Sequence, residues 1–582
     1  MRAKCVYWLA GFGMLVLPGL SGADSEWNPN ERCLKILVDA VPGILRSQDK
    51  ATGRFDTAPW ICTDQNVLYP LAAAWKVEDP KNPYHGSAEV LEAIMKGGDA
   101  LVAAQDDKGM WTFRKKDNST WGQIYMAWTY SRWIRAFRII KDAMPPERRV
   151  VWERGLQLGF DGISQTCLKE IHNIPTHQAM ALYCAGLCFQ RDEWTKQASE
   201  FLGRVVTAQS PDGWWSQHSG PLIKYNYVFV ESLGAYYTMS HEASVLDALR
   251  RAAVFHTTFT YPDGTDVETI DERNPFETTV ERGCAGFSHT PEGRAYLLRQ
   301  SQFPGRSMTP DTAAEFLLEG ETGPASSGLS EREESLTVTG DGHALVLRRK
   351  PWFICLSAFT GEISESRWIQ DRQNFVSIFR DGAGLLIGGG NTKLQPYWSN
   401  FTVGDPALLR HEPGDEKPHF KPSGDLLHVP QKAALRTDAK APGLDLTYGD
   451  EPCRITVSPD SADQLTISCE ASCRSGKLVE GHIALLPRLG TNLVCASGRR
   501  IKLGQEAFEW SASEMGNRFD YVGFRLSVPP GARLMWPEKR HNPYKKDGSS
   551  SLEDARLVLC LPFSPAVTKH EIVLKAIETV TP

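Results

Sequence analysis

The chain has 582 residues, of which 41% are hydrophobic and 23% are charged, so it can bury a large core. Its formal net charge is −6, which argues against nucleic acid as a partner, because binding to phosphates needs basic patches. An anionic ligand of another kind is not excluded, since a local basic cleft can lie on an acidic protein.

Residues 1–23 have the three-part pattern of a secretory signal peptide. Arg2 and Lys4 precede the apolar stretch "VYWLAGFGMLVLPGL", and the small residues of "SGA" follow it. We expect cleavage after Ala23. The alternative is an uncleaved anchor, but the stretch is short for a membrane span of ~20 apolar residues. The mature chain is therefore expected to be secreted or periplasmic, without membrane contact.

The cysteine spacing gives no sign of a metal centre. Cys184 and Cys188, like Cys469 and Cys473, are too far apart along the chain for the close CxxC pairs of a zinc ribbon. We therefore predict no cofactor and no catalytic metal, while a structural ion remains compatible with the sequence. Disulfides are compatible with an oxidising compartment, and the spacing does not specify their pairing.

From about Glu31 to Leu318 the apolar residues recur at helical spacing. The segment "WGQIYMAWTYSRWIRAFRII" carries two apolar stripes, so a helix there would be buried on two sides. Other helical segments end in turns such as "DDKGMW" and "SPDGWW". Antiparallel helix pairs of this kind predict an incomplete α/α toroid over residues 24–318.

The polar stretch "EGETGPASSGLSEREES", residues 319–335, is predicted to be a linker. After it the period of the pattern changes to two. The segment "NFVSIFRDGAGLLIGGG" has the form of a hairpin around an Asp-Gly turn, and "ARLVLCLPF" alternates strictly. Residues 336–582 are therefore predicted to form an antiparallel β-sandwich, and the chain is a multidomain protein with an α domain followed by a β domain.

The stretch "HNIPTHQAMALYCAG", residues 172–186, places ionisable groups at the start of an apolar helix. Pro175 suits the first turn, and Asn173 or Thr176 can cap it. His177 then lies where the helix dipole disfavours the imidazolium, so that its neutral ring can accept a proton. We predict that His177 faces a cleft; the alternative is a capping or core histidine.

Three further segments are dense in aromatic and charged residues near predicted turns. They are "DGWWSQHSGPLIKYNYVFVESLGAYY", "YPDGTDVETIDERNP" and "DNSTWGQIYMAW". Aromatic rings at junctions between loops and helices are where sugar rings stack, although core packing explains most tryptophans. The candidate substrate-binding residues in these segments are Asn118, Trp121, Gln123, Trp214, Lys224, Asp271 and Arg273.

In their order along the chain, "HQAMALYCAG", "DGWW…GP…YNY" and "YPDGTDVETIDERNP" resemble the heparinase II/III-like and alginate-lyase-like polysaccharide lyases. The resemblance implies an α/α toroid joined to a β-sandwich, and β-elimination on a polysaccharide that contains uronic acid. Family members have Asn directly before the His, whereas Thr176 stands there in this chain. The nearest asparagine is Asn173, with Asn118 as its rival.

The resemblance also implies roles for individual residues. His177 would remove the C5 proton or help to neutralise the carboxylate, and Tyr225 or Tyr227 would protonate the leaving oxygen. Tyr225 is the stronger candidate, because Tyr227 inside the first helical turn is more easily explained by core packing. Asn173 or Asn118 would neutralise the uronate carboxylate. Lys224 and Arg273 would help to hold the anionic chain.

Two other functions fit the same pattern. A glycoside hydrolase on a toroid would use a pair of carboxylates, for which Asp64, Asp266 and Asp271 are available. A non-catalytic carbohydrate-binding protein would retain binding without turnover. In each case the expected partner is a saccharide, and for the lyase it is an anionic polysaccharide or oligosaccharide.

Overall fold

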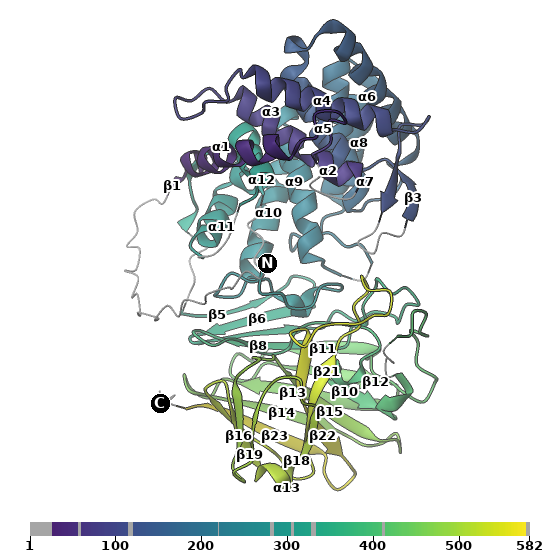
Figure 1. Cartoon of the computed structure of the whole chain (residues 1–582). Coiled ribbons are helices and arrows are strands. Elements are labelled where there is room, and N and C mark those ends of the chain that lie inside the picture. The colour runs from purple at the N-terminus through teal and green to yellow at the C-terminus, as the bar shows by residue number, and fades with distance from the viewer. Residues whose placement is uncertain are drawn as a thin grey trace, which may run out of the picture.

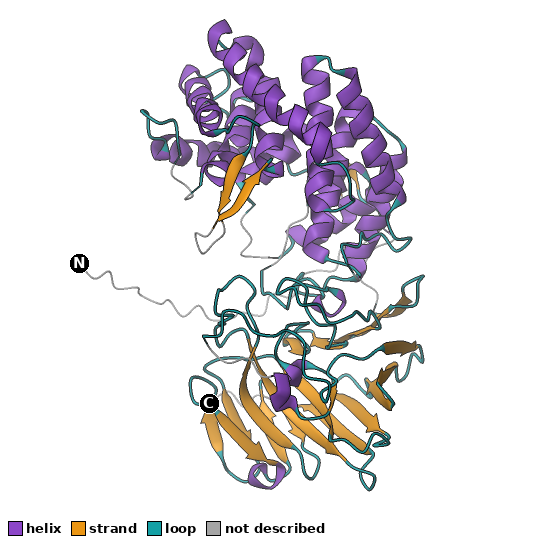
Figure 2. Ribbon diagram, turned by 90° about the vertical axis from the view of Figure 1, so that its right-hand side faces the viewer, coloured by secondary structure: helices purple, strands orange, loops and turns teal. Residues whose placement is uncertain are grey.

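The computed structural model describes residues 26–55, 60–114, 120–218, 220–279, 284–303, 308–327, 333–409 and 414–577. A helical N-terminal part is followed by a part built of antiparallel sheets, which confirms the predicted fold class (Figures 1 and 2). The predicted signal peptide lies outside the described residues. Within them, no helix combines the length and the apolar character that crossing a membrane would require.

The helical part consists of antiparallel pairs arranged in a ring. Its helices are α1 (Asn30–Ser47), α2 (Ile61–Asp64), α3 (Leu68–Lys76), α4 (Ala88–Ala104), α5 (Ala127–Ile140), α6 (Pro146–Thr166), α7 (Asn173–Phe189), α8 (Asp192–Thr207), α9 (Ile223–Ser240), α10 (Ser244–Thr258), α11 (Pro291–Ser301) and α12 (Pro310–Glu319). Helices α3, α5, α7 and α9 pack in succession, and α12 contacts both α9 and α3. Helices α1, α4, α8 and α10 pack against this inner ring from outside.

Ion pairs between α5 and α12 fix the inner ring. Arg132 pairs with Asp311. One turn further along α5, Arg135 lies 3.5 Å from Glu315 and 3.0 Å from Glu319, which are one and two turns further along α12. Because both residue numbers increase together, the two helices run in the same direction. Their N-terminal ends therefore lie at the same end of the ring.

The second part consists of two large antiparallel sheets. The first has the order β18-β21-β22-β15-β9-β8-β7-β6-β5, with β10 beside β15, and the second has the order β11-β12-β13-β14-β23-β20-β19-β16-β17. The strands of the first sheet are β5 (Glu334–Val338), β6 (Ala344–Arg349), β7 (Trp352–Ser357), β8 (Val376–Arg380), β9 (Gly384–Ile387), β10 (Phe401–Val403), β15 (Val479–Leu485), β18 (Phe508–Ser511), β21 (Arg533–Lys539) and β22 (Ala555–Phe563).

The strands of the second sheet are β11 (Lys432–Arg436), β12 (Gly443–Tyr448), β13 (Glu451–Ser458), β14 (Gln464–Ala471), β16 (Asn492–Cys495), β17 (Arg500–Lys502), β19 (Arg518–Tyr521), β20 (Phe524–Ser527) and β23 (Lys569–Ala576). Burial alternates along β13 and β14, as expected for strands with one face in a core. Apolar side chains of both sheets, such as Ile354, Ile455 and Leu559, form that core.

The helical part and the sandwich share a second apolar core. Tyr261, which follows α10, stacks on Phe379 of β8 with ring centroids 5.1 Å apart and meets Phe353 of β7 edge-on at 5.2 Å. The backbone N–H of Gly389 donates to Glu268 over 2.9 Å. The turn that follows α10 is therefore seated on the first sheet.

The predicted linker, residues 319–335, begins at the last residue of α12. It contains the short strand β4 (Gly323–Pro324), which pairs with β1 (Glu26–Trp27) near the start of the described chain. Residues 328–332 lie outside the described residues. The domain boundary itself stays a prediction.

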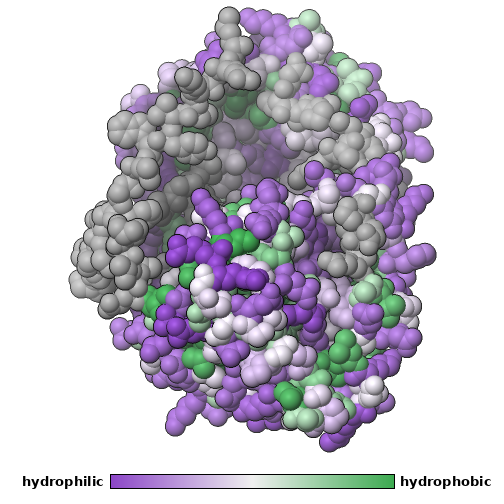
Figure 3. Space-filling model, turned by 60° about the horizontal axis from the view of Figure 1, so that its bottom comes forward, coloured by the Kyte–Doolittle hydropathy of each residue, from purple (hydrophilic) through white to green (hydrophobic). Residues whose placement is uncertain are grey.

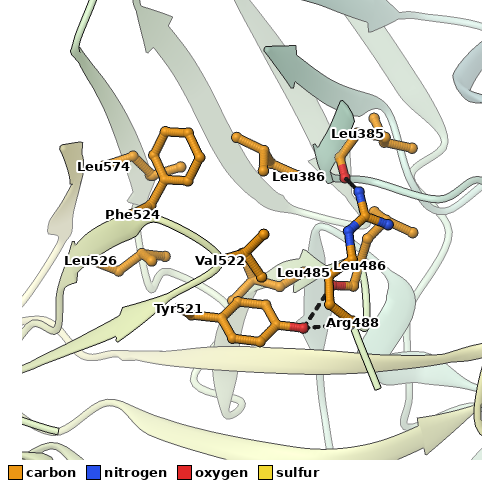
Figure 4. A pocket seen from close by; sticks show the side chains of 10 residues that line it. All are labelled: Leu385, Leu386, Leu485, Leu486, Arg488, Tyr521, Val522, Phe524, Leu526 and Leu574. Carbon is orange, nitrogen blue, oxygen red and sulfur yellow. Dashed lines mark hydrogen bonds between the residues drawn. The ribbon is translucent and has the colours of Figure 1, made fainter. Parts of the chain in front are cut away.

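A small pocket inside the sandwich is structural. Figure 4 shows that leucines and aromatic rings line it and that Arg488 lies at one side. The hydroxyl of Tyr521 accepts from the backbone N–H of Arg488 over 2.6 Å and donates to the carbonyl of Leu486 over 3.1 Å. A volume of about 10 Å³ is too small for a sugar ring.

Candidate active site between the helical part and the sandwich

Asp271 ties the start of α9 to the turn that follows α10. Its buried carboxylate accepts from the backbone N–H groups of Ile223, Arg273 and Asn274 over 2.8, 2.7 and 2.7 Å. Ile223 is the first residue of α9, so the carboxylate satisfies a free N–H at that helix end. The sequence predicts that Asp271 binds substrate; the structure instead gives it a positioning role, because its oxygens are already used.

Arg273 lies among three aromatic rings from both parts of the molecule. Its guanidinium carbon is 5.2 Å from the ring centre of Tyr225, 5.7 Å from that of Trp368 and 6.0 Å from that of Tyr544. Its Nη2 also donates to the Tyr544 hydroxyl over 3.4 Å. Within the described chain, its buried Nε has no hydrogen-bond partner. A guanidinium that is fixed in place and has an N–H without an acceptor is suited to bind an anion.

Tyr225 has the properties of a proton donor. Burial raises the pKa of its phenol, and the Arg273 guanidinium opposes that rise. The phenol therefore keeps its proton at neutral pH. Tyr227, two residues on, is buried with its hydroxyl hydrogen-bonded to that of Tyr296, and its ring packs on His256. Tyr227 is therefore a core residue, as expected for a tyrosine inside the first helical turn.

His177 lies in the core, contrary to the predicted cleft position. Its imidazole is fully buried, 2.7 Å from Ser131 Oγ and 3.2 Å from Ser232 Oγ, and it stacks on Trp128. Burial, with Arg132 close by, lowers the pKa of His177 well below its ordinary value. The physical reason for the difference is that α7 is an inner helix, so both neighbours in the ring enclose this side chain.

Two other histidines lie closer to the surface at this end of the ring. His172 directly precedes α7, and its Nδ1 is 3.4 Å from Oδ1 of Asn173, the first residue of that helix. Burial lowers the pKa of His172, and the nearby His218 lowers it further, whereas the hydrogen bond to Asn173 opposes the shift. His218 is exposed in the turn before α9. Asn173 is buried but lies beside the half-buried His172.

His218 is the residue that the sequence reasoning missed. It stands in "DGWWSQHSGP", directly before the helix of the two candidate tyrosines. That position could have marked His218 as a candidate site residue. The same turn packs on the sandwich through Gly220, where φ is +147° and an added Cβ would lie 2.7 Å from Nη2 of Arg372. Only glycine permits this close approach without a shift.

Two further residues that were predicted to bind substrate have partners within the protein. Lys224 forms an ion pair with Glu277, so its charge is partly neutralised. Trp214 packs edge-on against Phe359 of the sandwich, with ring centroids 5.6 Å apart, and therefore joins the two parts. Trp214 is half-buried, and its role in substrate binding stays a prediction.

Trp121 and Gln123 lie on a hairpin of β2 (Trp111–Arg114) and β3 (Thr120–Ile124). Figure 2 shows this hairpin at the lower edge of the helical part, above the sandwich. Trp121 is 66% exposed and meets Phe113 at 5.4 Å, and Gln123 donates to Thr112 over 3.1 Å. The structure does not bring them into contact with Arg273. Asn118 lies outside the described residues.

Of the carboxylates proposed for a hydrolase, Asp266 and Asp271 line one small pocket of about 20 Å³, and Asp64 is not among its lining residues. Asp64 is buried, pairs with Arg54 at 3.3 Å and accepts from the N–H of Phe55 over 3.1 Å. Asp271 holds three backbone N–H groups, as described above. Two of the three candidates, the third being Asp266, therefore have structural roles.

A polar hollow of about 570 Å³ adjoins Arg273. Its walls come from the turn after α10 and from sandwich loops, and the face between the two parts is recessed in the space-filling view (Figure 3). The lining includes Arg273, Glu277, Gln370, Asn391, Arg540, Asn542, Tyr544, Lys545 and Lys546. A hollow of this size can hold a small ligand, and its polar groups can fix the orientation of that ligand.

One group of side chains in the sandwich has the composition of a metal site. Glu480, His482 and Cys560 are buried, and their ligand atoms lie within 4.8 Å of one another. Arg533 binds both carboxylate oxygens of Glu480 at 2.6 and 2.9 Å. The carboxylate therefore already has a cationic partner from the protein, and this group lies apart from the hollow.

The comparisons with known proteins identify the fold. No family model matches the chain, and no curated protein matches it in sequence. A Paenibacillus xanthan lyase is 12% identical with a TM-score of 0.57, over 95% of this chain and 58% of its own. A Streptomyces coelicolor chondroitin AC lyase, in complex with chondroitin sulphate, is 14% identical with a TM-score of 0.53, over 96% and 81%. A heparinase III is 13% identical with a TM-score of 0.51, over 88% and 76%.

The fold is that of the polysaccharide lyases. The resemblance inferred from three short sequence segments is thereby confirmed for the architecture, an α/α toroid joined to a β-sandwich. The chain spans less than two thirds of the xanthan lyase chain that it matches.

Proposed function

We propose that the protein is an exported lyase that cleaves a polysaccharide containing uronic acid by β-elimination. The observation that carries the proposal is the Tyr225–Arg273 pair, whose ring centre and guanidinium carbon are 5.2 Å apart. Asp271 holds both elements of the pair in place, and the pair lies where the toroid meets the sandwich. A proton donor beside a cation is what elimination next to a carboxylate requires.

The reaction needs three groups. Arg273, with the amide of Asn173, would neutralise the uronate carboxylate and thereby acidify the proton at C5. A neutral histidine would take that proton, and the electron pair would form the double bond between C4 and C5. As the bond from C4 to the glycosidic oxygen breaks, Tyr225 would give its phenolic proton to that oxygen. Trp121 and Gln123 on the hairpin would contact a more distant part of the polymer.

We assign the base to His172 in place of His177. A base must reach the substrate, and His177 is enclosed by its neighbours in the ring. His172 is half-buried and has a lowered pKa, so it is neutral and can accept a proton at neutral pH. His218 is the rival for this role, and the two are distinguished by their single alanine variants.

Two tyrosine variants test the proposal. Tyr225→Phe removes one oxygen but keeps the ring against Arg273, so it should lower elimination ~10²–10⁴-fold. Tyr227→Phe is the matched control, since it removes the same atom two residues away inside the core, and its turnover should stay close to that of the wild type. The measurement is the ultraviolet absorbance of the unsaturated uronate. Equal rates for wild type and Tyr225→Phe would remove Tyr225 from the mechanism.

A further inference from the structure

The hollow beside Arg273 carries an excess of positive charge. Among the residues that the structure describes, four cationic ones line it, Arg273, Arg540, Lys545 and Lys546, with one carboxylate, that of Glu277. Glu277 is paired with Lys224 of α9. The lining that the sandwich contributes is therefore cationic, and it faces the turn that holds Arg273.

The cations of the hollow differ in how far the protein neutralises them. Arg540 lies 2.9 Å from Asp554, and Lys546 lies 2.7 Å from Glu416. For the exposed Lys545, as for Arg273, no ion pair is found in the described part of the chain. The charge of Lys545 contributes to lowering the pKa of the nearby Asp547, but Asp547 does not line the hollow. Two cations that have no ion pair at the hollow favour the binding of an anion.

An aromatic ring lies beside these cations. Tyr544 is 46% exposed, although it is a large aromatic residue, and Trp368 supports it edge-on with ring centroids 5.3 Å apart. The apolar face of a sugar ring can pack on such a ring while its anionic group meets a cation. Arg273 contacts the rings of both Tyr225 and Tyr544, so it connects the proposed proton donor to the hollow.

We infer that this hollow binds an acidic sugar unit adjacent to the uronate that is cleaved. The inference rests on the proposed function for the position of the scissile bond. Tyr544 stacks on the sugar and Lys545 holds its carboxylate or sulfate, while Arg273 binds the carboxylate of the uronate that is cleaved. The sandwich thereby selects the substrate: polymers with an anion on the neighbouring sugar are preferred to polymers in which that sugar is neutral.

Binding measurements test this inference without turnover. In the Tyr225→Phe background, calorimetry compares a polyuronate oligosaccharide, a sulfated uronate oligosaccharide and the carboxyl-reduced, neutral form of the first. Lys545→Ala should weaken binding of the acidic ligands ~3- to 10-fold and leave the neutral ligand unchanged. Lys502→Ala, an exposed lysine on the edge strand β17, is the control for the lost charge and should change none of the three.

The aromatic contribution is tested separately. Tyr544→Ala should weaken binding of all three ligands ~2- to 10-fold, and Tyr544→Phe should restore it, because the ring is kept. The tighter of the two acidic ligands identifies the anion as carboxylate or sulfate. If Lys545→Ala and Tyr544→Ala bind the acidic ligands as tightly as their parent does, the inference is overturned. If both variants lose affinity but the wild type cleaves no uronate polymer, the subsite stands and the proposed function falls.

Discussion

At the scale of single residues, His177 shows how burial separates a structural histidine from a reactive one. Its ring is hydrogen-bonded to hydroxyls of α5 and α9, so removing it takes one of two partners from each buried hydroxyl and disturbs the packing around them. We expect His177→Gln to lower the free energy of unfolding by ~1–3 kcal/mol. Chemical denaturation measures this, with Tyr227→Phe as a second core variant. An unchanged denaturation midpoint would contradict the core position.

The same residue predicts a dependence of stability on pH. The folded pKa of His177 lies well below 6.5, its ordinary value, because the ring is buried beside arginines. Below the unfolded pKa the unfolded chain therefore binds more protons, and the stabilisation is lost as the pH falls. The stability difference between wild type and His177→Gln should shrink as the pH is lowered below 6.5. A difference that grows on acidification would show that the imidazole is charged in the folded state.

The pH profile of catalysis follows from two other groups. The pKa of His172 is lowered from 6.5 and that of Tyr225 is raised from 10.0, mainly by burial in both cases. A neutral base and a protonated acid then coexist over a wide range. We expect kcat/KM to fall only below pH 6.5 on the acid side and only above pH 10 on the alkaline side. A narrow optimum inside that range would assign the two roles to other groups.

At the scale of elements, the site depends on how the turn after α10 meets α9. Asp271→Ala leaves three backbone N–H groups without their acceptor, among them that of the first residue of α9. We expect the free energy of unfolding to fall by ~1–3 kcal/mol and turnover to fall with it, since Tyr225 and Arg273 lose their common anchor. Thermal unfolding and initial rates measure the two effects.

Asp39→Ala is the matched control for that variant. Asp39 is exposed on α1 and pairs with Lys35 four residues away, so its loss should change stability by less than ~0.5 kcal/mol. If Asp271→Ala behaves like this control, the carboxylate does not anchor the site.

The candidate site could be predicted only in part from the sequence. Tyr225 and Arg273 stand at helix and turn boundaries that residue types mark, and the structure brings them together. Trp368 and Tyr544 come from sandwich loops far along the chain, and no local pattern connects them to Arg273. The cleft position of His177 was wrong because periodicity marks an apolar helix without showing which neighbours enclose each face.

The fold could be predicted more fully than the site. A change of period from helical spacing to alternation is a property of long segments, so the misassignment of a few residues does not hide it. The pairing of β4 with β1 could not be predicted, because two-residue strands carry no pattern and their pairing depends on the ends of the toroid meeting.

At the scale of the whole molecule, the shared core makes the two parts interdependent. Tyr261 packs on Phe353 and Phe379 across the junction. We expect a single unfolding transition in which the helical and sheet signals of circular dichroism change together, and Tyr261→Ala should shift both to lower temperature. Two well-separated transitions in the wild type would show that the parts are stable independently.

The central claim is that the chain breaks a uronic acid polymer by elimination, and the chemistry of the product tests it most directly. The wild-type protein is incubated with xanthan, heparan and chondroitin chains and with polyuronates, and the products are analysed by mass spectrometry and ultraviolet absorbance. We expect products with a double bond between C4 and C5 in the new terminal uronate, each one water lighter than its hydrolysis counterpart. Saturated products would show a hydrolase, and binding without any cleavage would show a saccharide-binding protein; either result would contradict the account.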